Sequence, residues 1–74
     1  MVPEVGAIRN EIRRLRFEHG EMTQQQLADR IHLTRQTVNA IEQGKYSPSL
    51  EAAFRIAAVF GEPLESVFRY TEGE

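Results

Sequence analysis

Side chains that donate and accept hydrogen bonds are concentrated between residues 33 and 50, in the segment LTRQTVNAIEQGKYSPSL. Val38 and Ile41 recur there at helical spacing, while the opposite positions carry Arg, Gln and Asn. A guanidinium can bond two adjacent acceptors, and a side-chain amide presents an acceptor beside a donor. On one face of a helix, such groups can bind the base edges of DNA. For this helix taken alone, the alternative is a solvated face without a ligand.

Two consecutive short helices are predicted to hold these groups. The first is expected over about 24–30, where Thr23 is the N-cap and Gln26, three residues later, completes a capping-box pattern. The second is expected over about 35–43, with Thr34 as its N-cap. A tight turn joins the two helices, and the pair forms a helix-turn-helix arrangement.

Three further helices are expected over 7–18, 49–60 and 63–68, which makes the fold all-α, a compact five-helix bundle. The first of these is predicted from the spacing of Ile8, Ile12 and Leu15. The segment VFRYT at 67–71 is rich in β-forming residues and alternates like a strand. The turns are expected to use Gly20, Gly44 and Gly61, and Pro63 suits the first turn of the last helix.

The helix over 49–60 is apolar on two nearly opposite sides. One stripe contains Leu50, Ala53, Phe54 and Ala57, and the other contains Ala52, Ile56 and Val59. A helix that is apolar all round is buried on all sides. The helix is therefore either the central helix of the bundle, or its second stripe contacts a partner subunit.

Composition limits the class of protein. The 74 residues are 41% hydrophobic and 27% charged, as in one small globular domain, and they include no cysteine. We therefore expect a single domain over 1–74, with a core over about 7–68, located in the cytoplasm. The formal net charge is −2, but the acidic excess lies in the C-terminal tail. The sequence offers no plausible catalytic triad, paired His or phosphate-binding loop, so no enzyme activity, metal site or cofactor is expected.

Much of the chain resembles the Cro/C1-type (XRE) family of helix-turn-helix transcriptional regulators. The resemblance runs from about Asn10 to Phe68 and includes MTQQQLADRIHLTRQTVNAIEQGKYSPSLEAAFRIAAVFGEPLESVF. It includes the T-Q-x-x-L-A start, the R-Q-T-V-x-x-I-E-x-G-K-x-x-P-S-L segment and the L-x-x-V-F ending. It implies a lambda-repressor-like fold and, in a prokaryotic cell, a DNA-binding regulator at the nucleoid.

The helical face and the resemblance together assign DNA contacts. Base reading is expected from Arg35, Gln36, Asn39 and Ala40, of which Arg35 could instead serve a phosphate. Contacts with the DNA backbone are expected from Gln24, Thr34, Thr37, Gln43, Lys45 and Tyr46. For Tyr46, the alternative is an aromatic side chain packed on the domain.

Other matched positions have structural interpretations. The family resemblance implies that Arg16 and Glu42 form an ion pair, whereas Arg13 and Arg14 are expected on a solvated face with a lesser role at the DNA backbone. His32 stands where such domains typically carry glycine, so a left-handed backbone is expected there. The HGEM turn is about one residue longer than usual, which affects the entry into the next helix.

The resemblance also implies a homodimer that binds a palindromic operator as a repressor. No small-molecule effector is evident from the sequence. The C-terminal strand is expected to pair with its symmetry mate, or else to be a frayed tail. The predicted interface comprises Ile56, Val59, Leu64, Val67, Phe68 and Tyr70. The alternative function is an antitoxin-like protein-binding module that uses DNA binding for autoregulation.

Overall fold

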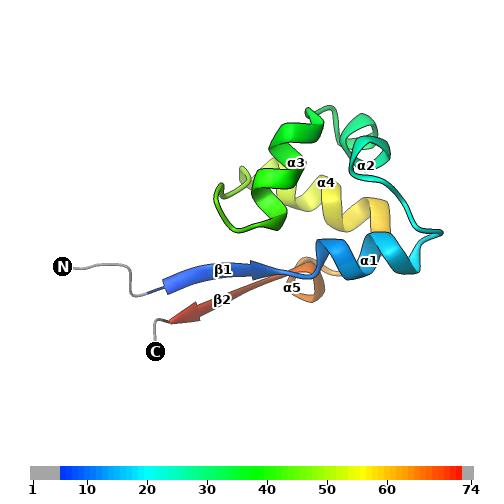
Figure 1. The fold of residues 1–74 in the computed structure, drawn as a ribbon. Coiled ribbons are helices and arrows are strands. Elements are labelled where there is room, and N and C mark those ends of the chain that lie inside the picture. Colours follow the sequence, from blue (N-terminus) through cyan, green and yellow to red (C-terminus); the bar gives the residue numbers. More distant parts are fainter. Residues whose placement is uncertain (1–5, 73–74) are drawn as a thin grey trace.

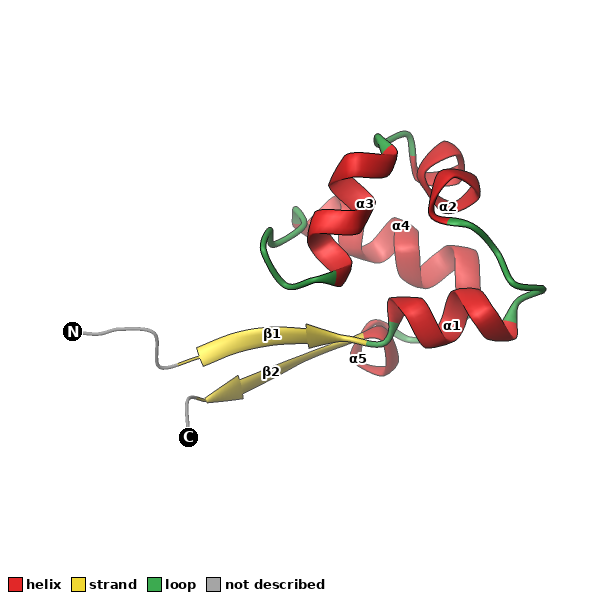
Figure 2. Cartoon of the chain, in the orientation of Figure 1, coloured by secondary structure: helices red, strands yellow, loops and turns green. Residues whose placement is uncertain are grey.

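The computed structural model describes residues 6–72, which form five helices and a two-stranded sheet (Figure 1). The helices gather into a globule, and the two strands project from it beside the chain ends (Figure 2). In chain order the elements are β1 (Gly6–Asn10), α1 (Ile12–Glu18), α2 (Gln24–Ile31), α3 (Arg35–Glu42), α4 (Leu50–Phe60), α5 (Leu64–Val67) and β2 (Phe68–Glu72). The predicted all-α helix-turn-helix fold with a short C-terminal strand is confirmed.

A single cluster of buried side chains holds the helices together. Its largest members are almost fully inaccessible, and each contributes roughly 1.5–3 kcal/mol by leaving water. The cluster contains Ile12, Leu15, Met22, Leu27, Ala28, Ile31, Val38, Ile41, Ile56, Ala57, Phe60 and Val67. Because α1 to α5 all contribute, the orientation of α3 depends on the whole core. No helix within residues 6–72 is long and apolar enough to cross a membrane.

Side-chain caps determine where the helices begin. Thr23 Oγ1 accepts from Gln26 N (3.0 Å), and Gln26 Oε1 accepts from Thr23 N (2.9 Å), which confirms the predicted capping box. Thr34 Oγ1 accepts from Thr37 N (3.1 Å) at the start of α3. Gly44 follows α3 with φ of 75°, a left-handed conformation that glycine adopts at little cost. The bounds predicted for α2 and α3 are therefore correct to one residue.

The first predicted helix is partly wrong, because residues 7–10 belong to β1. Asn10 supplies a physical reason: its Oδ1 accepts from the backbone N–H of Ile12 (3.1 Å), the first residue of α1, so the helix begins only after Asn10. Residues 6–10 pair with β2, so Ile8 is opposite Tyr70 and is exposed instead of extending the apolar stripe of α1.

The C-terminal strand was predicted, but its partner in the structure is β1 of the same chain. The two strands are antiparallel, with Ile8 opposite Tyr70, Arg9 opposite Arg69, and Asn10 opposite Phe68. The strand is neither a frayed tail nor dependent on a symmetry mate for its pairing. Side chains alternate along a strand, so Ile8 and Asn10 share one face with Phe68 and Tyr70, and the two arginines lie on the other.

Helix α4 is buried on one side only. Ala52, Ile56 and Ala57 are buried, but Leu50 and Phe54 are 69% and 53% exposed. The prediction of a helix buried all round is therefore wrong. Within the first stripe only Leu50 and Phe54 are exposed, because Ala53 and Ala57 are buried. The second stripe, which was assigned to a partner, has Ile56 in the core.

Two turns carry unusual backbone conformations. His32 has φ of 63° and ψ of 39°, which confirms the predicted left-handed conformation between α2 and α3. The longer turn before α2 uses positive φ at both Gly20 (79°) and Glu21 (57°), and then buries Met22. The extra residue is thus accommodated in the turn, while Thr23 still caps α2.

Candidate nucleic-acid interface

The outward face of α3 carries the side chains predicted to read bases. Val38 and Ile41 are buried beneath the helix, whereas Arg35 and Gln36 are exposed. Asn39 and Ala40 are partly exposed, as expected on the flank of the outward side. Since α3 lies at the surface of the globule (Figure 1), these residues are available to a groove wide enough for a helix.

The hydroxyl groups at the start of α3 are engaged within the protein. Thr34 Oγ1 caps the helix, and Thr37 Oγ1 lies 2.9 Å from it. Their contacts with phosphates stay a prediction, which their position at a helix N-terminus supports, because the helix dipole favours an anion there.

A hydrogen-bonded network links α1, α2 and α3 behind this face. Arg16 donates from Nε to Glu42 Oε2 (2.6 Å), from Nη2 to Glu42 Oε1 (3.2 Å) and from Nη1 to the Met22 carbonyl (2.7 Å). Gln24 Nε2 lies 3.2 Å from Glu42 Oε1 and 3.1 Å from Asn39 Oδ1. The predicted Arg16–Glu42 pair is present, and its contacts extend to a proposed base-reading residue.

Asn10 was not foreseen as part of the interface, and Arg13 was given only a lesser role there. Arg13 is exposed, as predicted, and it lines a hollow of about 370 Å³ together with Gln24, Asn39 and Gln43. Its spacing of three residues from Arg16 on α1 is the sequence signal that both point toward α3. Asn10 Nδ2 donates to the Ile41 carbonyl (2.9 Å), which secures the end of α3 to β1.

Arg14 agrees with its predicted place on a solvated face. Its guanidinium donates to Glu11 Oε1 (3.1 Å) and Glu18 Oε2 (3.0 Å). Hydrogen bonds with Glu11, and then with Glu18, raise the pKa of Arg14 above its ordinary value. Two carboxylates thus compensate the charge of Arg14 within α1.

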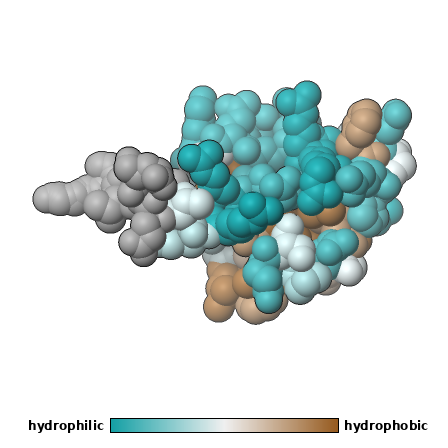
Figure 3. All heavy atoms as spheres, turned by 90° about the horizontal axis from the view of Figure 1, so that it is seen from below, coloured by the Kyte–Doolittle hydropathy of each residue, from teal (hydrophilic) through white to brown (hydrophobic). Residues whose placement is uncertain are grey.

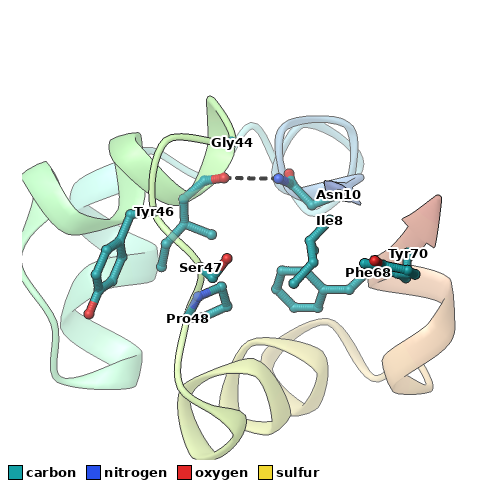
Figure 4. Close-up of a pocket in the computed structure, with 9 residues that line it drawn as sticks. Ile8, Asn10, Gly44, Tyr46, Ser47, Pro48, Phe68 and Tyr70 are labelled. Carbon is teal, nitrogen blue, oxygen red and sulfur yellow. Dashed lines mark hydrogen bonds between the residues drawn. The ribbon is translucent and has the colours of Figure 1, made fainter. Parts of the chain in front are cut away.

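The loop after α3 presents Gln43, Lys45 and Tyr46 to solvent. Tyr46 is 55% exposed, so its ring is not packed away in the domain. It borders a hollow of about 350 Å³ between this loop and the two strands, which Ile8, Pro48 and Phe68 also line (Figure 4). The exposure of these side chains is compatible with the predicted contacts between this loop and the DNA backbone.

Replacing Lys45, the only lysine of the chain, by alanine is expected to weaken binding to every DNA sequence alike. A lysine on a phosphate releases counterions, so its loss should flatten the plot of log K against log salt concentration by about 0.9. Titrations at several salt concentrations measure the slope. Arg14→Ala, which removes the same charge from a neutralised site, is the control and should leave the slope unchanged. An equal slope for Lys45→Ala and wild type would exclude the contact.

The residues predicted at a dimer interface are divided between core and surface. Ile56 and Val67 are buried in the core of the monomer and are therefore corrected to structural residues. Val59, Leu64 and Phe68 are partly buried against that core, and Tyr70 is 63% exposed. A hollow of about 310 Å³ is lined by Ile8, Pro48, Leu50, Ala53, Leu64 and Phe68. Figure 3, which shows the molecule from below, has hydrophobic side chains along the lower edge of the globule.

The capped α2–turn–α3 unit, packed on α4 with its polar face outward, defines a helix-turn-helix protein. A helix-turn-helix family model matches residues 12–67. An HTH-type transcriptional regulator of Methanocaldococcus jannaschii is 43% identical over 90% of this chain and all of its own length. Another from Methanothermobacter thermautotrophicus is 50% identical over 82% of this chain and 88% of its own. YgzD of Bacillus subtilis, also named an HTH-type transcriptional regulator, is 41% identical over 82% of this chain and 91% of its own.

The chain belongs to the helix-turn-helix family of the Cro/C1 type. This is a family of DNA-binding transcriptional regulators and not of enzymes. Among residues 6–72, no group of His, Cys, Asp or Glu side chains could hold a metal ion.

Proposed function

We propose that this protein is a sequence-specific repressor that binds a palindromic operator as a homodimer in the cytoplasm. The observation that carries the proposal is the outward face of α3, where a guanidinium and two amides stand above a fully packed apolar side. In the major groove, Arg35 and Gln36 would form hydrogen bonds with bases, and Ala40 would allow close approach or contact a thymine methyl group.

The phosphate contacts would surround this base-reading face. Gln24, Thr34 and Thr37 lie at the N-terminal ends of α2 and α3, where backbone N–H groups and the helix dipole favour an anion. Gln43, Lys45 and Tyr46 are exposed at the other end of α3. Backbone contacts at both ends would fix the orientation of the helix, while the side chains between them read sequence.

Selection of binding sites from random double-stranded DNA tests this function. A symmetric consensus is expected, with half-sites whose centres are about one helical turn apart, since a two-fold dimer presents two recognition helices. Enrichment of one half-site alone would exclude the proposed dimeric reading. Absence of any enriched sequence would overturn the function, and a pull-down that then captured a toxin-like partner would favour the protein-binding alternative.

We propose that the second copy binds at the face shared by the strands and the start of α4. Ile8, Phe68 and Tyr70 lie on one side of the two-stranded sheet, and Leu50 and Leu64 continue this apolar surface. Burial of such a surface against its own copy would supply the favourable free energy of association. The second edge of β2 could also pair with its symmetry mate, as the sequence predicted.

Tyr70→Glu is expected to shift the protein from dimer toward monomer, because a charge would be buried in the proposed interface. Sedimentation velocity across a concentration series measures the shift. The matched control is Phe17→Glu, which introduces the same charge at an exposed aromatic residue of α1, away from this face, and should leave the dimer intact. A Tyr70→Glu dimer of unchanged stability would place the interface elsewhere.

A further inference from the structure

Asn39 is held by two other amides, and this contact determines which of its atoms can face DNA. Its Oδ1 accepts from Gln24 Nε2 (3.1 Å) and from Gln43 Nε2 (3.3 Å). An amide oxygen has two lone pairs, so these two donors occupy its normal accepting capacity. In the part of the chain that the structure describes, Asn39 Nδ2 donates to no protein acceptor.

The polarity of Gln24 is fixed by charged groups on both of its sides. Its Nε2 lies 3.2 Å from Glu42 Oε1, and its Oε1 lies 3.5 Å from Arg35 Nη1. Glu42 is paired with Arg16, and an ionised carboxylate can only accept hydrogen bonds. A reversed Gln24 amide would place its oxygen against a carboxylate and its nitrogen against a guanidinium, both repulsive. The Gln24 nitrogen must therefore face Glu42.

The polarity of Gln24 in turn fixes that of Asn39. With its nitrogen toward Glu42, Gln24 also directs that nitrogen at Asn39, so the atom of Asn39 that meets it must be the acceptor, Oδ1. A reversed Asn39 would place its own NH₂ group against this donor. The ion pair beneath α3 thus determines, through two amides, that the free end of Asn39 is the nitrogen.

We propose that Asn39 acts as a donor only and selects a base with a keto oxygen in the major groove. Guanine offers adjacent N7 and O6 acceptors, and thymine offers O4. The usual amide–adenine pair needs the amide oxygen to accept from adenine N6, and Oδ1 of Asn39 is already occupied by two amides. The inference rests on the proposed function, because it assigns a specificity to one of the proposed base-reading residues.

The isosteric variant Asn39→Asp tests the polarity directly. One aspartate oxygen would keep the hydrogen bonds with Gln24 and Gln43, and the other would face DNA as an acceptor. At the base pair that Asn39 contacts, the wild type should prefer guanine or thymine. Asn39→Asp should reverse this preference toward cytosine or adenine, whose exocyclic amino groups are donors. Asn39→Ala identifies the operator position that Asn39 contacts, because this variant should lose its base preference at that position and at no other.

The variant Gln24→Met/Gln43→Met tests the origin of that polarity. With both donors removed, Oδ1 becomes free and the bidentate adenine pair becomes available. Relative affinity for adenine at this position should then rise about fivefold or more. Both methionine substitutions preserve chain length and helix propensity, and the circular dichroism spectrum checks that the variant is folded.

The outcomes separate the inference from the proposed function. If selection with the wild type yields no consensus, both are overturned. If a consensus appears but the Asn39 position favours adenine, or Asn39→Asp leaves its preference unchanged, only the donor assignment is overturned.

An NMR measurement without DNA adds an independent criterion: the Gln24 side-chain NH₂ should exchange with water more slowly than that of Asn39. The reverse order would contradict the proposed polarity.

Discussion

Replacing Arg16 by methionine should lower the free energy of unfolding by up to about 3–5 kcal/mol, the range for removal of one partner from a buried ion pair, because this pair is largely buried. The side chains of Arg16 and Glu42 are only 15% and 8% exposed. Without the guanidinium, the Glu42 carboxylate and the Met22 carbonyl both lose a donor. Small domains have a total stability of about 5–15 kcal/mol, so a large fraction of the stability would be lost.

Urea denaturation of the wild type, Arg16→Met, Glu42→Met and the double variant provides the measurement. The double variant should be more stable than Arg16→Met, because no unpaired carboxylate then remains buried. Arg14→Met, at an exposed pair on the same helix, is the control and should cost less than about 1 kcal/mol. Comparable losses for Arg14→Met and Arg16→Met would show that the buried pair has no special role.

Arg35→Ala and Gln36→Ala should each reduce specific operator binding by about 1–3 kcal/mol, or about 5- to 150-fold. Both side chains are exposed on α3, and a guanidinium or amide can form two hydrogen bonds with one base. Loss of these two hydrogen bonds should weaken the preference for one base at a single operator position, while the affinity for unrelated DNA should change less. Competition titrations with operator and scrambled DNA at one fixed salt concentration measure both quantities.

The controls for these variants lie on the preceding helix. Gln25 and Arg30 are exposed on α2 and repeat the two side-chain types outside the proposed base-reading face. Gln25→Ala and Arg30→Ala should therefore leave the specificity ratio unchanged. If Arg35→Ala and Gln36→Ala also leave operator affinity unchanged, α3 is not the recognition helix.

Local sequence signals predicted the parts of the fold that depend on local interactions. The capping box of Thr23 and Gln26 and the cap of Thr34 involve residues within about one turn of each other. The left-handed conformation of His32 was expected from the family resemblance instead. The strand Gly6–Asn10 was missed because its partner lies at Phe68–Glu72, about sixty residues along the chain. Its isoleucine fits a helical stripe and a strand equally well, and only tertiary pairing decides between them.

In the candidate site, too, the sequence predicted the features within one helix but not the contacts between helices. Periodicity placed Arg35 and Gln36 outward because Val38 and Ile41 had to be buried. The link from Gln24 to Asn39 crosses from one helix to the next, so no spacing within either helix reveals it. The exposure of Leu50 and Phe54 was also missed, since an apolar residue at the surface leaves no mark in the hydrophobic pattern.

Asn10 connects three elements. It ends β1, its Oδ1 accepts from the first residue of α1, and its Nδ2 donates to the Ile41 carbonyl in the last turn of α3. The direction in which the strand pair leaves the globule is therefore tied to the orientation of α3. In a dimer assembled through the strands, this fixed orientation of the strand pair relative to α3 would determine the distance between the two copies of α3. The fold of the monomer would then fix the distance between the operator half-sites that the protein can bind. One asparagine that lies far from any base would contribute to this distance.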